Sequence, residues 1–145
     1  MAGLQVWKGS AMQSIFGTAV LIINVLFCLL TVWRSAIALE GFVEKLGLAI
    51  VNADGLNEVR AQYSGFFLAV AVVCLASLAG LLSRQVSFVV MAAVYGGLLA
   101  GRLASLALNT GTAGYGQIIV ALYFIDAAGL ALAVAALALD HHGKA

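Results

Sequence analysis

Uncharged apolar stretches dominate the chain, and four of them are long enough to cross a membrane. The predicted spans cover residues 14–35, 58–83, 86–108 and 117–139. About 20 apolar residues form a helix that crosses the hydrocarbon core, and the apolar positions here are continuous, unlike the alternating strands of a membrane β-barrel. A continuous apolar segment in lipid satisfies its backbone as a helix. The pattern predicts an all-α integral membrane protein, a four-helix bundle built as one domain of residues 1–145.

The longest connection joins the first two spans and contains a second apolar pattern. Within residues 41–52, Phe42, Leu46, Ala49 and Ile50 fall on one helical stripe, which predicts a short helix lying in the membrane interface. A turn follows, and Asp54 is the predicted N-cap of the second span. The link between spans three and four is short and rich in glycine, and we expect its Tyr115 at headgroup level.

The amino-acid composition supports this architecture and restricts the classes of partner that the protein can have. Hydrophobic residues make up 64% of the 145 residues and charged residues 9%. A soluble chain of this size must leave much of its surface in water, so a soluble domain is excluded and the lipid bilayer is the expected partner. The net charge of +1 provides no basic face for nucleic acid.

Four crossings place both termini on one side, here named the terminal end, and the two longer links at the opposite loop end. Basic residues are equally divided: Lys8, Arg84 and Lys144 lie at the terminal end, and Arg34, Lys45 and Arg60 at the loop end. The positive-inside rule places the end with more free Lys and Arg in the cytoplasm. We expect the termini there, on the interpretation that Arg60 pairs within the fold and so does not count toward the loop end.

Two charged residues lie inside the predicted spans, Arg102 in the third and Asp126 in the fourth. A charge near a helix centre costs about 2.5–3.5 kcal/mol on insertion, so such residues normally face inward and pair. Arg102 lies six residues and Asp126 nine residues from the loop end, or about 9 and 13 Å. Because Cα–Cβ bonds tilt toward the helix N-terminus, the two side chains converge. We predict an Arg102–Asp126 ion pair.

This pair has two interpretations. It either fixes the register of two helices, or it forms the polar floor of a ligand pocket or a proton-linked site. Glu58 and Arg60 lie at a depth that allows them to join it, although Arg60 is equally able to reach the headgroups. Tyr123 and Tyr95 are possible donors to the same cluster, or lipid-facing tyrosines.

Small and polar residues indicate how the helices approach one another. On span three they recur every four residues, at Ala93, Gly97, Gly101 and Ser105. Such a stripe favours close packing inside the chain, or alternatively dimerisation or docking on another protein. The alanine-rich fourth span should lie tight against a neighbour, and Asn24 in span one predicts an interhelical hydrogen bond.

Motifs for catalysis are missing. Cys28 and Cys74 lie on different spans without a CxxC pair, which argues against thiol-redox chemistry. His141 and His142 point about 100° apart on a helix and cannot clamp one metal, although one axial contact to a haem or chlorophyll stays open. There is no phosphate loop, nucleophile elbow or catalytic carboxylate dyad. We predict that the protein is not an enzyme, and the sequence leaves its cofactors unknown.

Three short motifs carry a resemblance to a known family. They are the stretch LNEVRAQYSG at residues 56–65, the pair Gly101–Arg102, and the acid in span four. The chain resembles a small bacterial inner-membrane family, domain of unknown function 4345. It departs from that pattern with Ser64 in place of a glycine and Asp126 in place of glutamate. The resemblance implies an inner-membrane four-helix bundle with Arg60, Arg102 and Asp126 as its polar set, and no established activity.

Together these features predict a protein that works by recognition. We expect an accessory subunit or docking partner of a larger membrane complex, or a binder of an apolar ligand such as a lipid, quinone or pigment. The alternative is a small proton-coupled transporter that uses Asp126. A free Asp126 in a water-filled cleft favours transport, whereas an Asp126 held by Arg102 beside an exposed small-residue stripe favours docking.

Overall fold

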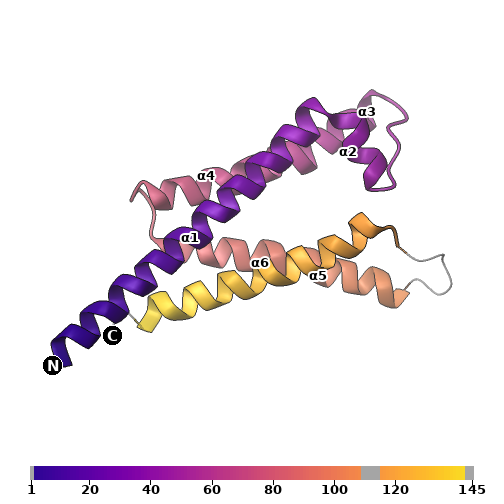
Figure 1. Ribbon diagram of the computed structural model, residues 1–145. Helices are drawn as coiled ribbons and strands as arrows, with labels where there is room; N and C mark the ends of the chain where they lie inside the picture. The colour runs from indigo at the N-terminus through magenta and orange to yellow at the C-terminus, as the bar shows by residue number, and fades with distance from the viewer. Residues whose placement is uncertain (1, 109–114, 143–145) are drawn as a thin grey trace.

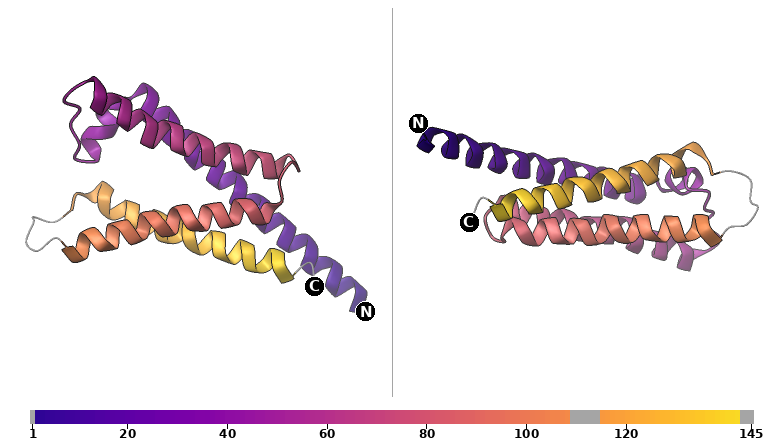
Figure 2. Two further views of the ribbon diagram at one scale, coloured as in Figure 1. Left: turned by 180° about the vertical axis from the view of Figure 1, so that it is seen from behind. Right: turned by 90° about the horizontal axis from the view of Figure 1, so that it is seen from below.

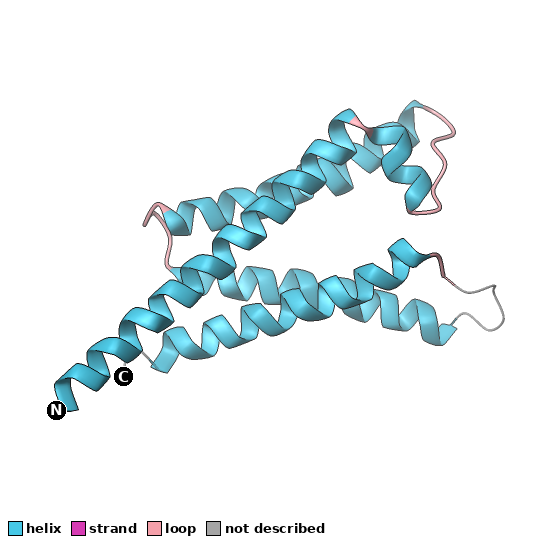
Figure 3. Ribbon diagram, in the orientation of Figure 1, coloured by secondary structure: helices cyan, strands magenta, loops and turns pink. Residues whose placement is uncertain are grey.

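Helices form almost the whole of the described chain. The computed structural model describes residues 2–108 and 115–142, with side chains from residue 14 to residue 140. Figure 3 shows helices joined by short loops, with no strand in the described ranges. The elements are α1 (Ala2–Ile37), α2 (Leu39–Lys45), α3 (Ala53–Val59), η1 (Arg60–Gly65), α4 (Phe66–Leu78), α5 (Arg84–Leu108) and α6 (Gln117–His142). Four segments are long and apolar enough to cross a membrane: Ser14–Ile37, Ala53–Leu78, Arg84–Leu108 and Gln117–Asp140.

The second span is one continuous helix made of α3, η1 and α4, and it is shifted from its predicted limits of 58–83. Its N-cap is Asn52, whose side chain accepts a 2.9 Å hydrogen bond from the Gly55 N–H, and not the predicted Asp54. In η1 the helix widens by one residue, so that the Phe66 N–H donates to the Ala61 carbonyl. The helix ends at Leu78 because Gly80, at φ +76°, closes it with a Schellman motif.

The short helix between the first two spans is also displaced. It covers Leu39–Lys45, so the predicted stripe over residues 41–52 is wrong beyond its first turn. Gly47 has φ +72°, and the Leu48 N–H donates to the Val43 carbonyl at 2.9 Å. A glycine in this left-handed conformation ends a helix, which leaves Ala49 and Ile50 in the following loop. Leu39 and Val43 form the buried face of α2.

The helices form two antiparallel pairs that diverge toward one end. The first hairpin contains α1 to α4, with α4 packed along α1, and the second contains α5 and α6. The two hairpins contact each other through α1 with α6 and α4 with α5. In Figure 1 the two pairs lie close where α4 leads into α5 and are apart near α2 and α3. Figure 2 shows the same divergence from behind, with both chain ends at the converging end, so the terminal end is the closed one.

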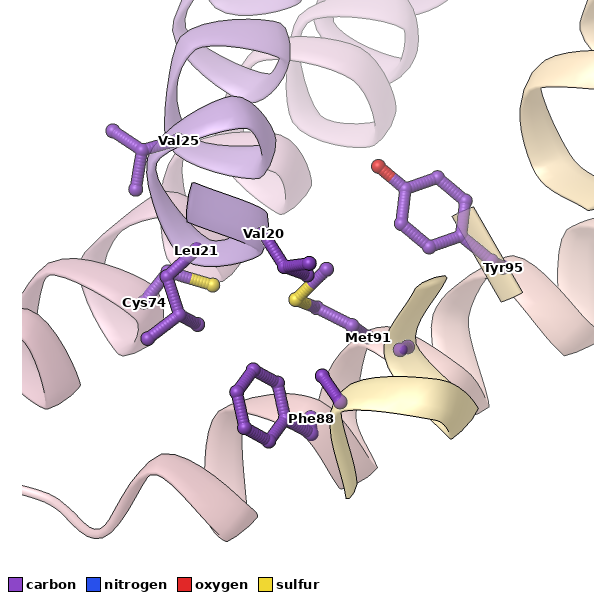
Figure 4. Packing of buried hydrophobic residues seen from close by; sticks show 9 residues of the cluster. Val20, Leu21, Val25, Cys74, Phe88, Met91 and Tyr95 are labelled. Carbon is purple, nitrogen blue, oxygen red and sulfur yellow. The ribbon is translucent and has the colours of Figure 1, made fainter. Parts of the chain in front are cut away.

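The main core lies in the terminal-end half, where the hairpins cross. Phe88 and Met91 of α5 face Val20 and Leu21 of α1, and all four side chains are buried (Figure 4). Buried hydroxyl groups join α4 to the start of α5: Ser77 and Ser87 are hydrogen-bonded at 2.8 Å. Nearby, Arg84 donates to the Ser14 carbonyl of α1 at 3.0 Å. These contacts fix the closed end of the bundle.

Helices α5 and α6 are in close contact at Gly129, a residue that the sequence patterns did not single out. A Cβ atom on Gly129 would lie 2.7 Å from ring atoms of Tyr95, so only glycine fits there without a shift. Ala133 and Ala136 of α6 are buried and the other alanines of this helix are exposed, so the predicted tight packing of the alanine-rich span holds on one face.

The predicted stripe on α5 faces the other way. Ala93, Gly97, Gly101 and Ser105 are all exposed, and no atom lies within 4 Å of a Cβ placed on Gly97 or Gly101. The prediction that Ala93, Gly97 and Gly101 pack inside the chain is therefore wrong, because α6 packs against another side of α5, where Gly129 meets Tyr95. Ser105 shares a 3.4 Å hydrogen bond with Tyr115, and the small residues Ala93, Gly97 and Gly101 are left open to lipid or to another protein.

Candidate functional site

Arg102 and Asp126 form the predicted salt bridge between α5 and α6. The Arg102 Nε donates to Asp126 Oδ2 at 2.6 Å, and the two side chains are 24% and 4% exposed. Helix α5 runs toward the loop end and α6 away from it, so the Cβ tilt brings the two side chains together as expected. Tyr123 donates its hydroxyl to the Arg102 carbonyl at 2.8 Å. Tyr123 thus joins the cluster through the backbone.

Pairing removes the cost of two isolated charges but uses only part of the guanidinium. Removing one partner would leave the other charge buried, which is the costly state in a low-dielectric interior. In the described chain neither Nη nitrogen of Arg102 has a hydrogen-bond partner. An arginine has five N–H donors, so most of this group stays available to a ligand.

A cleft of about 440 Å³ opens beside this pair, between the two hairpins at the loop end. Helices α1, α2, η1 and α4 form one wall, and α5 and α6 form the other. Most of the lining is apolar: Phe27, Leu30, Phe42, Leu46, Phe67, Leu98, Ile118 and Leu122. The polar lining consists of Thr31, Arg34, Lys45, Tyr63, Arg102 and Asp126.

Aromatic contacts hold the wall formed by the first hairpin. The Phe27 ring of α1 meets the Phe67 ring of α4 edge to face at 6.3 Å, and Phe42 of α2 meets Tyr63 of η1 at 5.2 Å. Edge-to-face pairs at these distances are favourable for aromatic rings. The Phe42–Tyr63 contact anchors α2 to the second span and so positions the residues that α2 places in the cleft.

A second polar network lies deeper, at the junction of three helices. Asn24 of α1 donates to the Cys74 Sγ of α4 at 3.2 Å and accepts the Tyr95 hydroxyl of α5 at 2.7 Å. All three residues are buried. The predicted interhelical hydrogen bond of Asn24 is confirmed. Tyr95 bonds to Asn24 and not to the Arg102–Asp126 pair, and the role of Cys74 had no signal in the sequence.

Glu58 and Arg60 do not belong to the cluster, and that prediction is wrong. Glu58 is exposed and accepts a 2.9 Å hydrogen bond from Gln62 on its own helix. Arg60 is exposed, does not line the cleft, and forms no salt bridge within the described chain. Both residues lie on the first hairpin, across the cleft from Arg102 and Asp126. The argument for cytoplasmic termini, which assumed a paired Arg60, therefore loses its basis.

The segment that carried the family resemblance has a local explanation of its own. Residues 60–65 form the widened turn η1. Ser64, which replaces the usual glycine, shares a 2.8 Å hydrogen bond with the buried Ser35 of α1. The departure from the family pattern thus ties η1 to α1, and Tyr63 beside it lines the cleft.

Arg34 and Lys45 line the cleft, although in the sequence they counted only among the basic residues of the loop end. A signal was present for Arg34, because Phe27, Leu30, Thr31 and Arg34 recur at intervals that share one face of a helix. No comparable signal places Lys45, since its position depends on how α2 folds back over α1.

The described ranges contain no group of side chains that meets the requirements of a metal site. In the described ranges no set of three or more His, Cys, Asp or Glu side chains lies close enough to hold a metal ion. Cys28 and Cys74 are buried free thiols. The side chains of His141 and His142 lie outside the described residues. The arrangement that is present, apolar walls with a few charged groups, suits a non-covalent ligand.

Comparison of this chain with protein-family models, curated proteins and solved structures gave no match. Membership of the family of domain of unknown function 4345 stays a prediction based on the three motifs.

Proposed function

We propose that this protein is a non-enzymatic membrane protein that binds an apolar or amphiphilic ligand in the cleft between its hairpins. The observation that carries the proposal is the cleft itself, which has apolar walls on both hairpins and the Arg102–Asp126 pair in its lining. Its volume of about 440 Å³ lies within the range of about 300–1,000 Å³ that is common for small-molecule sites. A lipid, quinone or pigment has the required chemistry.

Each part of the lining has a function in this proposal. The alkyl chain or ring system of the ligand would pack against Phe27, Phe67 and Leu98. Removing this apolar surface from water lowers the free energy of the complex. A polar group on the ligand would bond to the open Nη donors of Arg102. The few polar residues in a mainly apolar site then fix the orientation of the ligand.

Purification in mild detergent, followed by mass spectrometry of the small molecules that travel with the protein, tests this proposal. A Leu98→Trp variant fills the cleft from α5, and Leu103→Trp on the exposed side of the same helix is the matched control. We expect one compound to be enriched with the wild type and with Leu103→Trp, and to be depleted with Leu98→Trp. Equal recovery of every compound from all three proteins would refute the proposal.

A second candidate function is docking on a larger membrane complex as an accessory subunit. The exposed Gly97 and Gly101 support it, because small residues on an open helix face allow close approach of a partner helix. We expect a Gly97→Ile variant to lose a membrane protein that co-purifies with the wild type, and Leu106→Ile, elsewhere on α5, to retain it.

The salt bridge weighs against the transporter alternative. A carrier of protons needs a carboxylate that is free to exchange its proton, whereas Asp126 is almost fully buried and bonded to a permanent cation. The pairing supports a role in binding.

For location we propose a bacterial inner membrane; the basic residues are divided equally between the two ends, so the side on which the termini lie is decided by experiment. The family resemblance supports the membrane assignment. The side of the cleft is tested with Gly116→Cys at the loop end, because the native cysteines are buried. Labelling of this variant by an impermeant maleimide added to intact cells would place the termini in the cytoplasm, and labelling only after lysis would place the loop end there.

A further inference from the structure

Charges at the loop end are unequally divided between the cleft and the outer surface. Four acidic residues of this end are exposed and lie outside the cleft lining: Glu40, Glu44, Asp54 and Glu58. Among the described residues only Asp126 places a carboxylate in the lining, against three cations, Arg34, Lys45 and Arg102, of which Arg34 and Lys45 are also exposed. The lining therefore carries two net positive charges (three minus one). The outer surface of this end, which also has the exposed Arg60, carries three net negative charges (four minus one).

The excess positive charge has no counterion within the described chain. Asp126 is already bonded to Arg102, and neither Arg34 nor Lys45 forms a salt bridge or a side-chain hydrogen bond there. Both lie in the last turn of their helices, where the helix dipole favours a cation. The dipole explains a basic residue at each helix end, but it does not require both side chains to line one cleft whose walls are mostly apolar.

We infer that the ligand of the cleft is an amphiphile with a phosphate monoester head group, an inference that rests on the proposed function and specifies its ligand class. A phosphate monoester carries about −1.5 to −2 charges at pH 7, which matches the two uncompensated cations. Guanidinium groups bind phosphate oxygens through paired N–H donors, and lysine binds them as a point charge. A carboxylate head would leave one cation unmatched, and a quinone would leave two.

The positions of the lining residues indicate where the head group and the alkyl chain of such a molecule would lie. Arg34 lies three residues from the end of α1 and Lys45 ends α2, so both cations belong to the mouth of the cleft. Phe27, Phe67 and Leu98 lie farther along their helices toward the bundle centre. The phosphate would lie at the mouth, between Arg34, Lys45 and the free donors of Arg102, and the alkyl chain would extend inward over the aromatic wall.

Calorimetric titration of the full chain in a neutral detergent tests the head group. The probes are dodecyl phosphate, dodecanoate and dodecanol, which have the same number of carbon atoms and differ in the charge of the head group. We expect the phosphate to bind most tightly, and Arg34→Gln or Lys45→Gln to weaken it about tenfold, the equivalent of about 1.4 kcal/mol. Arg60→Gln is the matched control, because it removes an exposed cation of the same end that does not line the cleft.

The outcomes separate this inference from the proposed function. Equal binding of dodecanol and dodecyl phosphate would overturn the head-group assignment and retain the apolar cleft. Equal binding of dodecanoate would overturn the phosphate class. An equal loss in Arg60→Gln and Arg34→Gln would overturn the site, since it would indicate attraction to the surface as a whole. Saturable binding of no probe would overturn both the inference and the proposed function.

Discussion

Replacing Arg102 with glutamine removes the cation that holds Asp126 and leaves the carboxylate in place. Asp126 is 4% exposed, so its charge would stay buried without a partner. Breaking a buried pair from one side costs about 3–5 kcal/mol. We expect Arg102→Gln to lower the free energy of unfolding by an amount in this range. The Tyr123 hydrogen bond should persist, because it is accepted by the backbone carbonyl at position 102.

Replacing the other partner, Asp126, should lower the free energy of unfolding by less. Asp126→Asn leaves the Arg102 guanidinium, which is 24% exposed and lines the cleft. Its long apolar stem lets the head move toward the mouth, where water is available. The loss should then be nearer the cost of a charged hydrogen bond, about 1.5–3 kcal/mol. The double variant has no buried charge and should be more stable than Arg102→Gln alone.

Unfolding by a rising fraction of sodium dodecyl sulfate in maltoside micelles, followed by far-ultraviolet circular dichroism, measures these differences. The four proteins form a double-mutant cycle, and we expect a coupling energy of about 2 kcal/mol or more, within the range for contacting residues. Arg60→Gln serves as the control and should change stability by less than about 0.5 kcal/mol. A coupling near zero, or an Asp126→Asn variant less stable than Arg102→Gln, would refute the reasoning.

Three further predictions concern the closed end and the helix contacts. Gly129→Ala should destabilise the protein by about 1–3 kcal/mol in the same titration, because its Cβ would meet the Tyr95 ring at 2.7 Å, whereas Gly97→Ala should be nearly neutral. Asn24→Leu should cost about 1–3 kcal/mol, because the buried Tyr95 hydroxyl loses its acceptor; unchanged stability would show that this network is dispensable. Cys28 and Cys74 are 1% and 0% exposed, so mass spectrometry should find neither alkylated by maleimide until the detergent-solubilised protein is unfolded.

The features that were predictable from the sequence are those that the bilayer itself imposes. Long uncharged segments must be helices in lipid, and all four spans follow from that rule. The Arg102–Asp126 pair was predictable for the same reason, since two charges at similar depth on consecutive helices have few other ways to be neutralised. The helix ends were partly predictable, because Gly47 and Gly80 are visible stop signals.

Features that depend on which face of a helix meets a neighbour were not predictable. A GxxxG stripe shows that a helix can be approached closely, but it does not identify the partner, and in this chain α6 packs elsewhere on α5. Gly129 in the alanine-rich span looks like any other small residue until Tyr95 is placed against it. Likewise, Arg34 and Lys45 acquire a common site only when α2 folds over the end of α1.

The hydrogen bonds of this bundle are distributed in a way that suits a ligand site at the loop end. Those that join the two described hairpins, from Arg84, Ser87 and Tyr95, all lie in the terminal-end half. Toward the loop end each hairpin is tied within itself, by Arg102–Asp126 in the second and by Ser35–Ser64 in the first. An amphiphile in the cleft would contact both hairpins where the chain leaves them apart, and its binding would therefore stabilise the folded bundle by mass action.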